Sequence, residues 1–177
     1  MRTLRFTVLI CFGLLAAGCP ARSISPLFSE KDIAFDPLLV GSWSQTGDEP
    51  LIFENSGDNT YRVTLQEKDQ KTTYTAHLGK LRNAWFIESF ADNSGNDYHL
   101  LPAFIVHRIW LEGDSLKLAA LRSDWLREMI DARKISIPHI RRDSEIILTA
   151  STEELQKFVA RYADVAFLDR ETFFRVK

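Results

Sequence analysis

The chain has 177 residues and a formal net charge of −2, and it is 45% hydrophobic and 26% charged. This length suits one domain with its own hydrophobic core. The slightly acidic balance, without a cluster of lysine and arginine, is untypical of proteins that bind nucleic acid. We therefore expect no nucleic acid among the partners.

The first 18 residues have the layout of a secretory signal peptide. Arg2 and Arg5 give a positively charged start, and residues 6–17 follow as an apolar run. This run is shorter than the roughly 20 apolar residues that a membrane-spanning helix needs. We therefore predict that residues 1–18 are a signal peptide and are absent from the mature chain.

The apolar run ends in Leu15-Ala16-Ala17-Gly18-Cys19, which resembles the lipobox of bacterial lipoproteins. The resemblance implies cleavage between Gly18 and Cys19, and a lipid on Cys19 that anchors the chain to a membrane of the cell envelope. The alternative is an ordinary signal peptide followed by a chance cysteine. In Gram-negative lipoproteins of this kind, an Asp after the cysteine retains the protein in the inner membrane. Pro20 stands there instead, which implies the outer membrane, facing the periplasm, if the source is Gram-negative.

The 159 residues that follow the signal peptide divide into a predicted tether and one domain. Cys11 is lost with the signal peptide, so Cys19 is the only cysteine of the mature chain and no intramolecular disulfide is expected. Residues 19–37, which are interrupted by prolines and serines, are expected to form a lipidated tether. Residues 38–177 are expected to form the folded domain.

Short strands separated by turn residues dominate the predicted domain. Tyr61, Val63 and Leu65 alternate with polar residues, which is the period of a half-buried strand, and residues 55–59 indicate a hairpin loop before it. The predicted strands cover residues 51–54, 61–66, 72–81, 84–90, 98–112, 115–121, 146–149 and 172–177. This succession favours a mainly β (α+β) fold, an antiparallel barrel of about eight to nine strands.

Two helices are predicted in the C-terminal half, over residues 124–133 and 152–163. Ser123 is expected to cap the first helix. Ser151 is expected to cap the second, with Glu154 three residues later completing a capping box. Each helix carries an apolar stripe, so we expect both to pack on the rim of the barrel.

The sequence Gly41-Ser42-Trp43, at the start of the first barrel strand, resembles the G-x-W signature of lipocalins and related calycin barrels. In that group the Trp packs at the closed end of the barrel, beneath an Arg from a late strand. The resemblance implies a lipocalin-like barrel closed by Gly41, Trp43 and Arg175, with a cation–π contact between the last two. Residues 148–155 are also similar to a stretch of small bacterial lipoproteins of unassigned function, and this similarity implies no activity.

Aromatic residues on several predicted strands are candidates to line the barrel interior. A barrel of about eight strands is either filled by side chains or holds one small ligand. In the first case the aromatic residues form the core, and in the second they bind an apolar ligand such as a lipid. The candidate ligand-binding residues are Phe53, Tyr61, Tyr74, Trp85 and Trp110.

The sequence carries no motif for catalysis or metal binding, so we expect no metal and no cofactor. The histidines, His77, His99, His107 and His139, form neither an H-x-H nor an H-E-x-x-H pattern. A hydrolase would need a carboxylate pair, for which Glu88, Asp97 and Glu112 are the candidates. The alternative is that these acids are simply exposed at strand ends.

These patterns favour a membrane-anchored envelope lipoprotein that is not an enzyme and acts as a binding or assembly module. One alternative is a carrier that holds a small apolar ligand, such as a lipid, in the barrel. Another is a hydrolase that acts on envelope glycans or lipids. The expected partners are the membrane, through the anchor, and either a small apolar ligand or an envelope protein.

Overall fold

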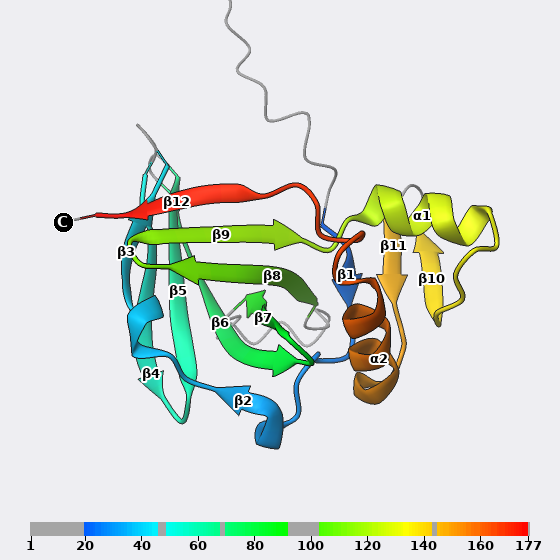
Figure 1. Cartoon of the computed structure of the whole chain (residues 1–177), viewed down its shortest axis with the longest axis horizontal. Helices are drawn as coiled ribbons and strands as arrows, with labels where there is room; N and C mark the ends of the chain where they lie inside the picture. The colour runs from blue at the N-terminus through cyan, green and yellow to red at the C-terminus, as the bar shows by residue number, and fades with distance from the viewer. Residues whose placement is uncertain (1–19, 46–48, 68–69, 92–102, 143–144, 177) are drawn as a thin grey trace, which may run out of the picture.

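The computed structural model describes residues 20–45, 49–67, 70–91, 103–142 and 145–176. These residues form an antiparallel β-barrel with a smaller layer of helices and strands on one side (Figure 1). The predicted mainly β fold, with two helices in the C-terminal half, is confirmed. The predicted signal peptide, its cleavage site between Gly18 and Cys19, and the lipidation of Cys19 all lie outside the described residues.

Within the described residues, eight strands close the barrel. They are β3 (Gly41–Ser44), β4 (Leu51–Gly57), β5 (Thr60–Glu67), β6 (Gln70–Leu81), β7 (Ala84–Ala91), β8 (Phe104–Glu112), β9 (Ser115–Ala120) and β12 (Glu171–Arg175). Every neighbouring pair in this ring is antiparallel, and the ring closes where β8 pairs with β9. The number of strands agrees with the eight to nine that the sequence predicts.

The barrel interior is a hydrophobic core. Successive residues of a strand point to opposite faces, so alternate side chains of each strand enter this core. Its buried members are Leu39, Trp43, Phe53, Tyr61, Val63, Ala76, Leu78, Ile87, Ile109 and Leu116. An eight-stranded barrel is just wide enough for such side chains to fill it, and here they form one continuous cluster.

A second layer lies on the outside of the barrel. It contains β1 (Arg22–Ser23), β10 (His139–Arg142), β11 (Glu145–Leu148), α1 (Ser123–Asp131) and α2 (Thr152–Tyr162). It joins the barrel through β8, whose residues 104–105 pair with β1 while residues 107–112 pair with β9. Strand β1 then pairs with β11 in parallel, and β11 pairs with β10.

The second layer and the outer wall of the barrel enclose a second hydrophobic core. Phe86, Val106 and Ala119 come from the barrel wall. The remaining buried members come from the layer itself, and they include Leu126 of α1, Leu148 of β11, and Leu155 and Val159 of α2. Strands β7, β8 and β9 therefore have buried residues on both faces, so apolar and polar residues do not alternate strictly along them.

The tether predicted for residues 19–37 differs from the structure, in which residues 20–37 belong to the folded body. Ala21, Leu27 and Phe28 are buried in the second core. Two short 3₁₀ helices, η1 (Glu30–Asp32) and η2 (Pro37–Leu39), follow, and β2 (Ile33–Ala34) pairs with β6 between them. Helix α2 also holds this segment, because the Thr152 hydroxyl donates a hydrogen bond to the Pro26 carbonyl at 2.8 Å.

Local boundaries differ from the sequence predictions in two places. Strand β4 continues to Gly57, and the hairpin turns at Asp58 and Asn59, whose positive φ angles of 47° and 58° are those of a type I′ turn. Helix α1 begins at Ser123 and its N-cap is Arg122, so Ser123 is not the cap. The capping box of Ser151 and Glu154 on α2 is confirmed.

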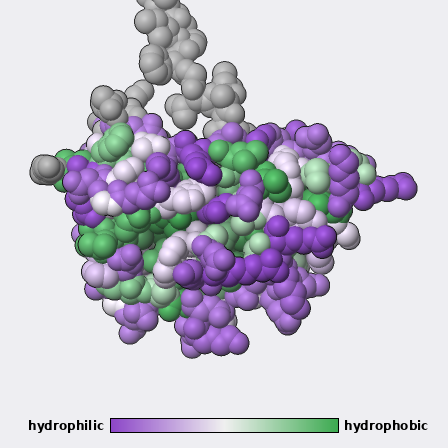
Figure 2. All heavy atoms as spheres, viewed as in Figure 1, coloured by the Kyte–Doolittle hydropathy of each residue, from purple (hydrophilic) through white to green (hydrophobic). Residues whose placement is uncertain are grey.

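The surface combines polar residues with several exposed hydrophobic side chains. Figure 2 shows polar residues over much of the face in view, with hydrophobic residues gathered toward the left, over the barrel. Among the described residues, the large hydrophobic residues that are exposed are Ile24, Leu38, Trp85, Ile140, Val165, Leu168, Phe174 and Val176. In the described part of the chain, no helix combines the length and the hydropathy needed to cross a membrane.

Candidate functional site

One end of the barrel, which we call the closed end, is covered by residues 33–40. The Tyr61 hydroxyl fixes this segment, because it donates to the Asp36 carbonyl at 3.0 Å and accepts from the Asp36 amide at 2.6 Å. The Tyr61 ring stacks on Phe35, with 4.9 Å between ring centres. Burial raises the pKa of Tyr61, so the hydroxyl keeps the proton that it donates. The indole nitrogen of Trp43 donates to the Leu39 carbonyl at 2.9 Å.

Arg175 completes the closed end. Its guanidinium carbon lies 4.2 Å from the centre of the Trp43 ring. The same group donates hydrogen bonds to the Val40 carbonyl, at 3.0 Å, and to the Leu38 carbonyl. Gly41 makes room for it, because a Cβ at this position would lie 2.6 Å from Arg175 Nη1, and the φ of Gly41 is +140°. The cation–π contact predicted for Trp43 and Arg175 is therefore present.

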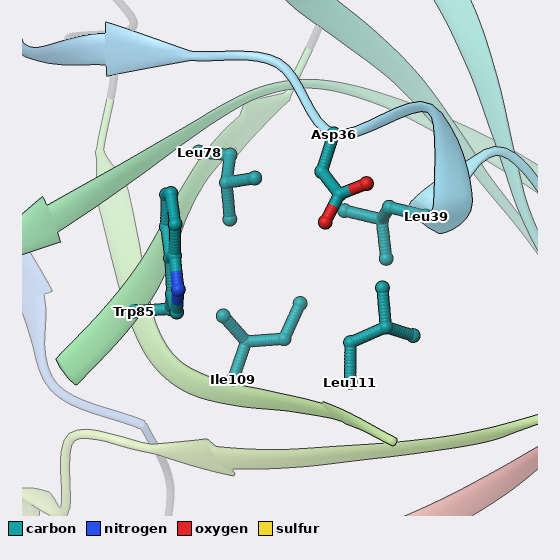
Figure 3. Close-up of a pocket in the computed structure, with 6 residues that line it drawn as sticks. All are labelled: Asp36, Leu39, Leu78, Trp85, Ile109 and Leu111. Carbon is teal, nitrogen blue, oxygen red and sulfur yellow. The ribbon is translucent and has the colours of Figure 1, made fainter. Parts of the chain in front are cut away.

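A small cavity of about 100 Å³ lies beside the closed end, and we call it the notch. Figure 3 shows its six lining residues, which come from the 33–40 segment and from β6, β7 and β8. They are Asp36, Leu39, Leu78, Trp85, Ile109 and Leu111. The exposed fraction of Trp85, one of these lining residues, is 39%, and that of Leu38, which precedes the lining residue Leu39 in the chain, is 66%.

The lining of the notch limits what it can bind. A cavity of 150 Å³ is enough for one benzene molecule, so the notch has room for an aliphatic side chain or a short alkyl group. Its walls are aliphatic apart from the Trp85 ring and the Asp36 carboxylate. One oxygen of that carboxylate accepts from the Leu38 amide at 2.9 Å. The notch therefore suits a small apolar group with a hydrogen-bond donor or a positive charge next to it.

The structure places four of the five predicted ligand-binding residues on the inner side of the barrel. Phe53 and Tyr61 are buried within the inner core, and Tyr74 packs against it. Their rings fill the interior, as in the core alternative stated above. Trp85 lies in the wall of the notch, so it alone among the five is accessible beside a cavity described here.

The fifth residue, Trp110, does not line the interior, so the prediction of its place in the barrel is wrong. Ile109 and Leu111 on either side of it face the inner core, so the alternation of the strand directs Trp110 outward. There it packs against the second core. The guanidinium carbons of Arg108 and Arg170 lie 4.7 Å and 4.3 Å from its ring centre.

A fully buried carboxylate, Glu88, lies on the outer face of β7. One of its oxygens accepts a hydrogen bond from the Leu27 amide, and the other lies 3.0 Å from Nδ1 of His77 on the neighbouring strand. One oxygen therefore holds residues 24–28 against the barrel, and the other joins β7 to β6. This is a structural role, and no local sequence pattern indicates it because Glu88 and Leu27 are 61 residues apart.

Among the residues that the structure describes, no candidate acid or histidine other than His77 bonds to Glu88. Glu112 forms an ion pair with Lys117 at 3.0 Å on the surface. The strand partner of Glu88 on β8 is Val106, which is six residues away from Glu112. Asp97 and His99 lie outside the described residues. His107 has Ile87 and Ala120 as its strand partners. Among the described residues, no group of three or more His, Cys, Asp or Glu is placed to hold a metal ion.

Trp125 on α1, which the sequence places on an apolar helix face, packs beside Tyr162 and Phe158 of α2, with ring centres 5.5 Å and 6.3 Å apart. It therefore belongs to the second core and not to the barrel.

Comparison of the chain with protein-family models, curated proteins and solved structures found no match. The structure therefore shows a closed antiparallel eight-stranded barrel, and no match assigns the chain to a family.

Proposed function

We propose that this chain is a lipid-anchored lipoprotein of the bacterial envelope, and that its lipocalin-like barrel is a non-enzymatic binding or assembly module. The observation that carries the binding role is the notch, with the partly exposed side chain of Trp85 in its wall. A small, well-packed pocket with an aromatic wall suits the anchoring side chain of a protein partner. The lipobox-like sequence that ends at Cys19 supports the anchor.

The proposed partner is an envelope protein that inserts one aliphatic side chain into the notch, next to a donor that meets Asp36. The notch is too small for a whole lipid chain, since its volume of about 100 Å³ is less than the 150 Å³ of a cavity that binds one benzene molecule. The packed aromatic residues Phe53 and Tyr61 also favour a scaffold over a carrier. For this reason we place partner binding before the carrier and the hydrolase.

Cross-linking in living cells tests the proposal. A photoreactive amino acid in place of Leu38 should give one defined cross-linked envelope protein, identified by mass spectrometry. Trp85→Ala should reduce that cross-link at least tenfold, because it removes one wall of the notch. The matched control is Trp110→Ala, which changes a Trp on the opposite face of the sheet and should leave the cross-link unchanged. Equal loss in both variants would show that the notch is not the binding surface.

Mass spectrometry of the purified protein separates this function from the carrier. The mature N-terminal peptide should carry acyl chains on Cys19, and a Cys19→Ser variant should be released from membranes. In a native spectrum of the released form, the mass should be that of the polypeptide alone. A reproducible added mass that extracts as a lipid would support the carrier and contradict the binding module.

A further inference from the structure

The chain is fixed to the folded body from its first described residue. Pro20 forms a β-bridge with Arg122, and the Ala21 amide donates to the Leu121 carbonyl at 2.7 Å. Ala21 itself is buried. Because consecutive Cα atoms are about 3.8 Å apart, the residue that would carry the lipid, Cys19, is one peptide bond away from this fixed point.

The connection between α2 and β12 lies directly beside that point. The Arg122 amide donates to the Ala166 carbonyl at 3.2 Å, so residues 165–168 run next to the bridge of Pro20 and Arg122. Figure 1 shows the same arrangement, with the segment before β12 passing the beginning of β1 at the end of β9. Segments distant in the sequence thus form one continuous surface around Pro20.

This surface presents two aliphatic side chains to solvent. The exposed fraction is 46% for Val165 and 52% for Leu168, whereas Ala166 and Phe167 between them are buried. The buried pair anchors the segment in the second core. Its exposed pair therefore has a fixed direction and is not the end of a loose loop.

The acids on this surface lie beside arginines. Asp164 pairs with Arg108 at 2.6 Å, and Asp169 lies 3.4 Å from Arg122. Arg122 also binds Asp124 at 2.6 Å. These three acids share two arginines, so most of the negative charge that would repel an anionic lipid headgroup is compensated on this surface.

We propose that Pro20, Arg122, Val165 and Leu168, here called the membrane face, rest on the lipid surface that holds the acyl chains of Cys19. This inference depends on the proposed lipidation. The reason for the lipid as the occupant is position, since the membrane begins where the anchor begins, and no tether separates the anchor from the body. Val165 and Leu168 then insert among the headgroups, where apolar side chains gain from burial.

Contact of the membrane face with the lipid surface also determines the orientation of the notch. Leu111 in the notch pairs with Leu116 near the start of β9, whereas Arg122 follows the end of the same strand. The six steps from residue 116 to residue 122 span roughly 20 Å in an extended strand. The membrane face and the notch are thus at opposite ends of β9, and the notch stays open to a partner while the body lies on the membrane.

Fluorescence quenching by lipids tests the orientation. The mature lipidated protein is reconstituted in vesicles of phosphatidylethanolamine and phosphatidylglycerol, some of which carry a nitroxide on the acyl chain near the headgroup. Cys19 is blocked by its thioether, so Val165→Cys and Leu168→Cys provide single sites for a bimane label. Leu38→Cys and Phe174→Cys, at residues that are more exposed than Val165 and Leu168, are the matched controls.

Labels at 165 and 168 should lose at least half of their fluorescence in nitroxide vesicles, whereas labels at 38 and 174 should lose less than a tenth. Equal quenching at all four sites, or quenching only at 38 and 174, would overturn the proposed orientation.

Sedimentation of the same samples distinguishes failure of the proposed lipidation from failure of the proposed membrane face. A protein that does not sediment with vesicles and has no acyl mass on Cys19 contradicts the lipoprotein function. One that sediments but shows no quenching at 165 and 168 contradicts only the membrane face.

Discussion

Arg175 of the last strand and Trp43 of the first barrel strand meet at the closed end, with the guanidinium carbon 4.2 Å from the centre of the indole ring. Because the two residues are 132 positions apart in the sequence, their contact joins the beginning and the end of the barrel. The hydrogen bonds from Arg175 to the carbonyls of Val40 and Leu38 extend this contact to the segment that covers the closed end.

The Arg175→Ala variant should therefore be less stable than the wild-type protein, by about 2 kcal/mol in the free energy of unfolding. This value combines one cation–π contact with two hydrogen bonds to backbone carbonyls. Arg175→Lys keeps the charge but not the planar fork, so it should recover less than half of the loss. Urea unfolding curves give both values. A full recovery by Lys would show that the charge alone matters at this position.

The ring of Phe28 packs on Gly79, and the Gly79→Ala variant should destabilise the protein for this reason. A Cβ on Gly79 would lie 2.5 Å from Phe28 Cε1, so either the ring or the 24–28 segment has to move. We expect a cost of about 1–3 kcal/mol, as for other overpacked sites. In a Phe28→Leu background the additional cost of Gly79→Ala should fall below about 1 kcal/mol, because the ring is gone. Additive costs in the double variant would contradict a direct clash.

Glu88 holds the amide of Leu27, and removal of its carboxylate should release residues 24–28 from the barrel. In Glu88→Ala the buried Leu27 amide loses its acceptor, which should cost about 3 kcal/mol. The hydrogen-exchange rate of the Leu27 amide should rise by the factor that corresponds to the loss in the free energy of local opening. Glu112→Ala is the control, because Glu112 forms only a surface ion pair and its loss should cost less than about 0.5 kcal/mol.

His107 should make the protein less stable in mild acid. Burial lowers the pKa of His107 to about 4 in the folded protein, against about 6.5 in an unfolded chain. Between these pH values the unfolded state binds a proton that the folded state does not. The stability contributed by neutral His107 is therefore complete above about pH 6.5 and is lost as the pH falls toward 4.

By pH 5, about 2 kcal/mol of that contribution should be lost. The His107→Asn variant has no titrating ring at this position, so its free energy of unfolding should change less between pH 7 and pH 5 than that of the wild-type protein. Urea titrations at the two pH values measure this difference. Identical pH dependence in both proteins would show that His107 is protonated without cost in the folded state.

The sequence patterns predict the barrel well because its hairpin strands are local and regular. Strands β5, β6 and β7 form between consecutive turns, and the predicted ranges lie within a few residues of the observed ones. The capping box at Ser151 was also readable, since its two partners are only three residues apart. The contact of Trp43 with Arg175 was reached only through the resemblance to lipocalins, because a contact between the chain ends has no local pattern.

Two parts of the structure cannot be predicted from local sequence patterns, and each has a physical reason. Strand β8 is covered on both faces, so its hydrophobicity does not alternate. The pattern therefore does not indicate that Trp110 points outward and Ile109 inward. Residues 20–37 contain only two-residue strands, and their positions depend on distant side chains such as Glu88 and Thr152. Such a segment has the proline and serine content of a tether, although it is packed as firmly as a strand.

Strand β8 belongs to the barrel and to the second layer at once, since one of its edges pairs with β7 and the other is divided between β1 and β9. A strand shared in this way leaves no hinge at which one part could swing relative to the other. We expect the barrel and the helical layer to melt in a single cooperative transition, with the most slowly exchanging amides in β8. A force applied near Pro20, the first residue of the rigid body, would then load the whole molecule through that one strand.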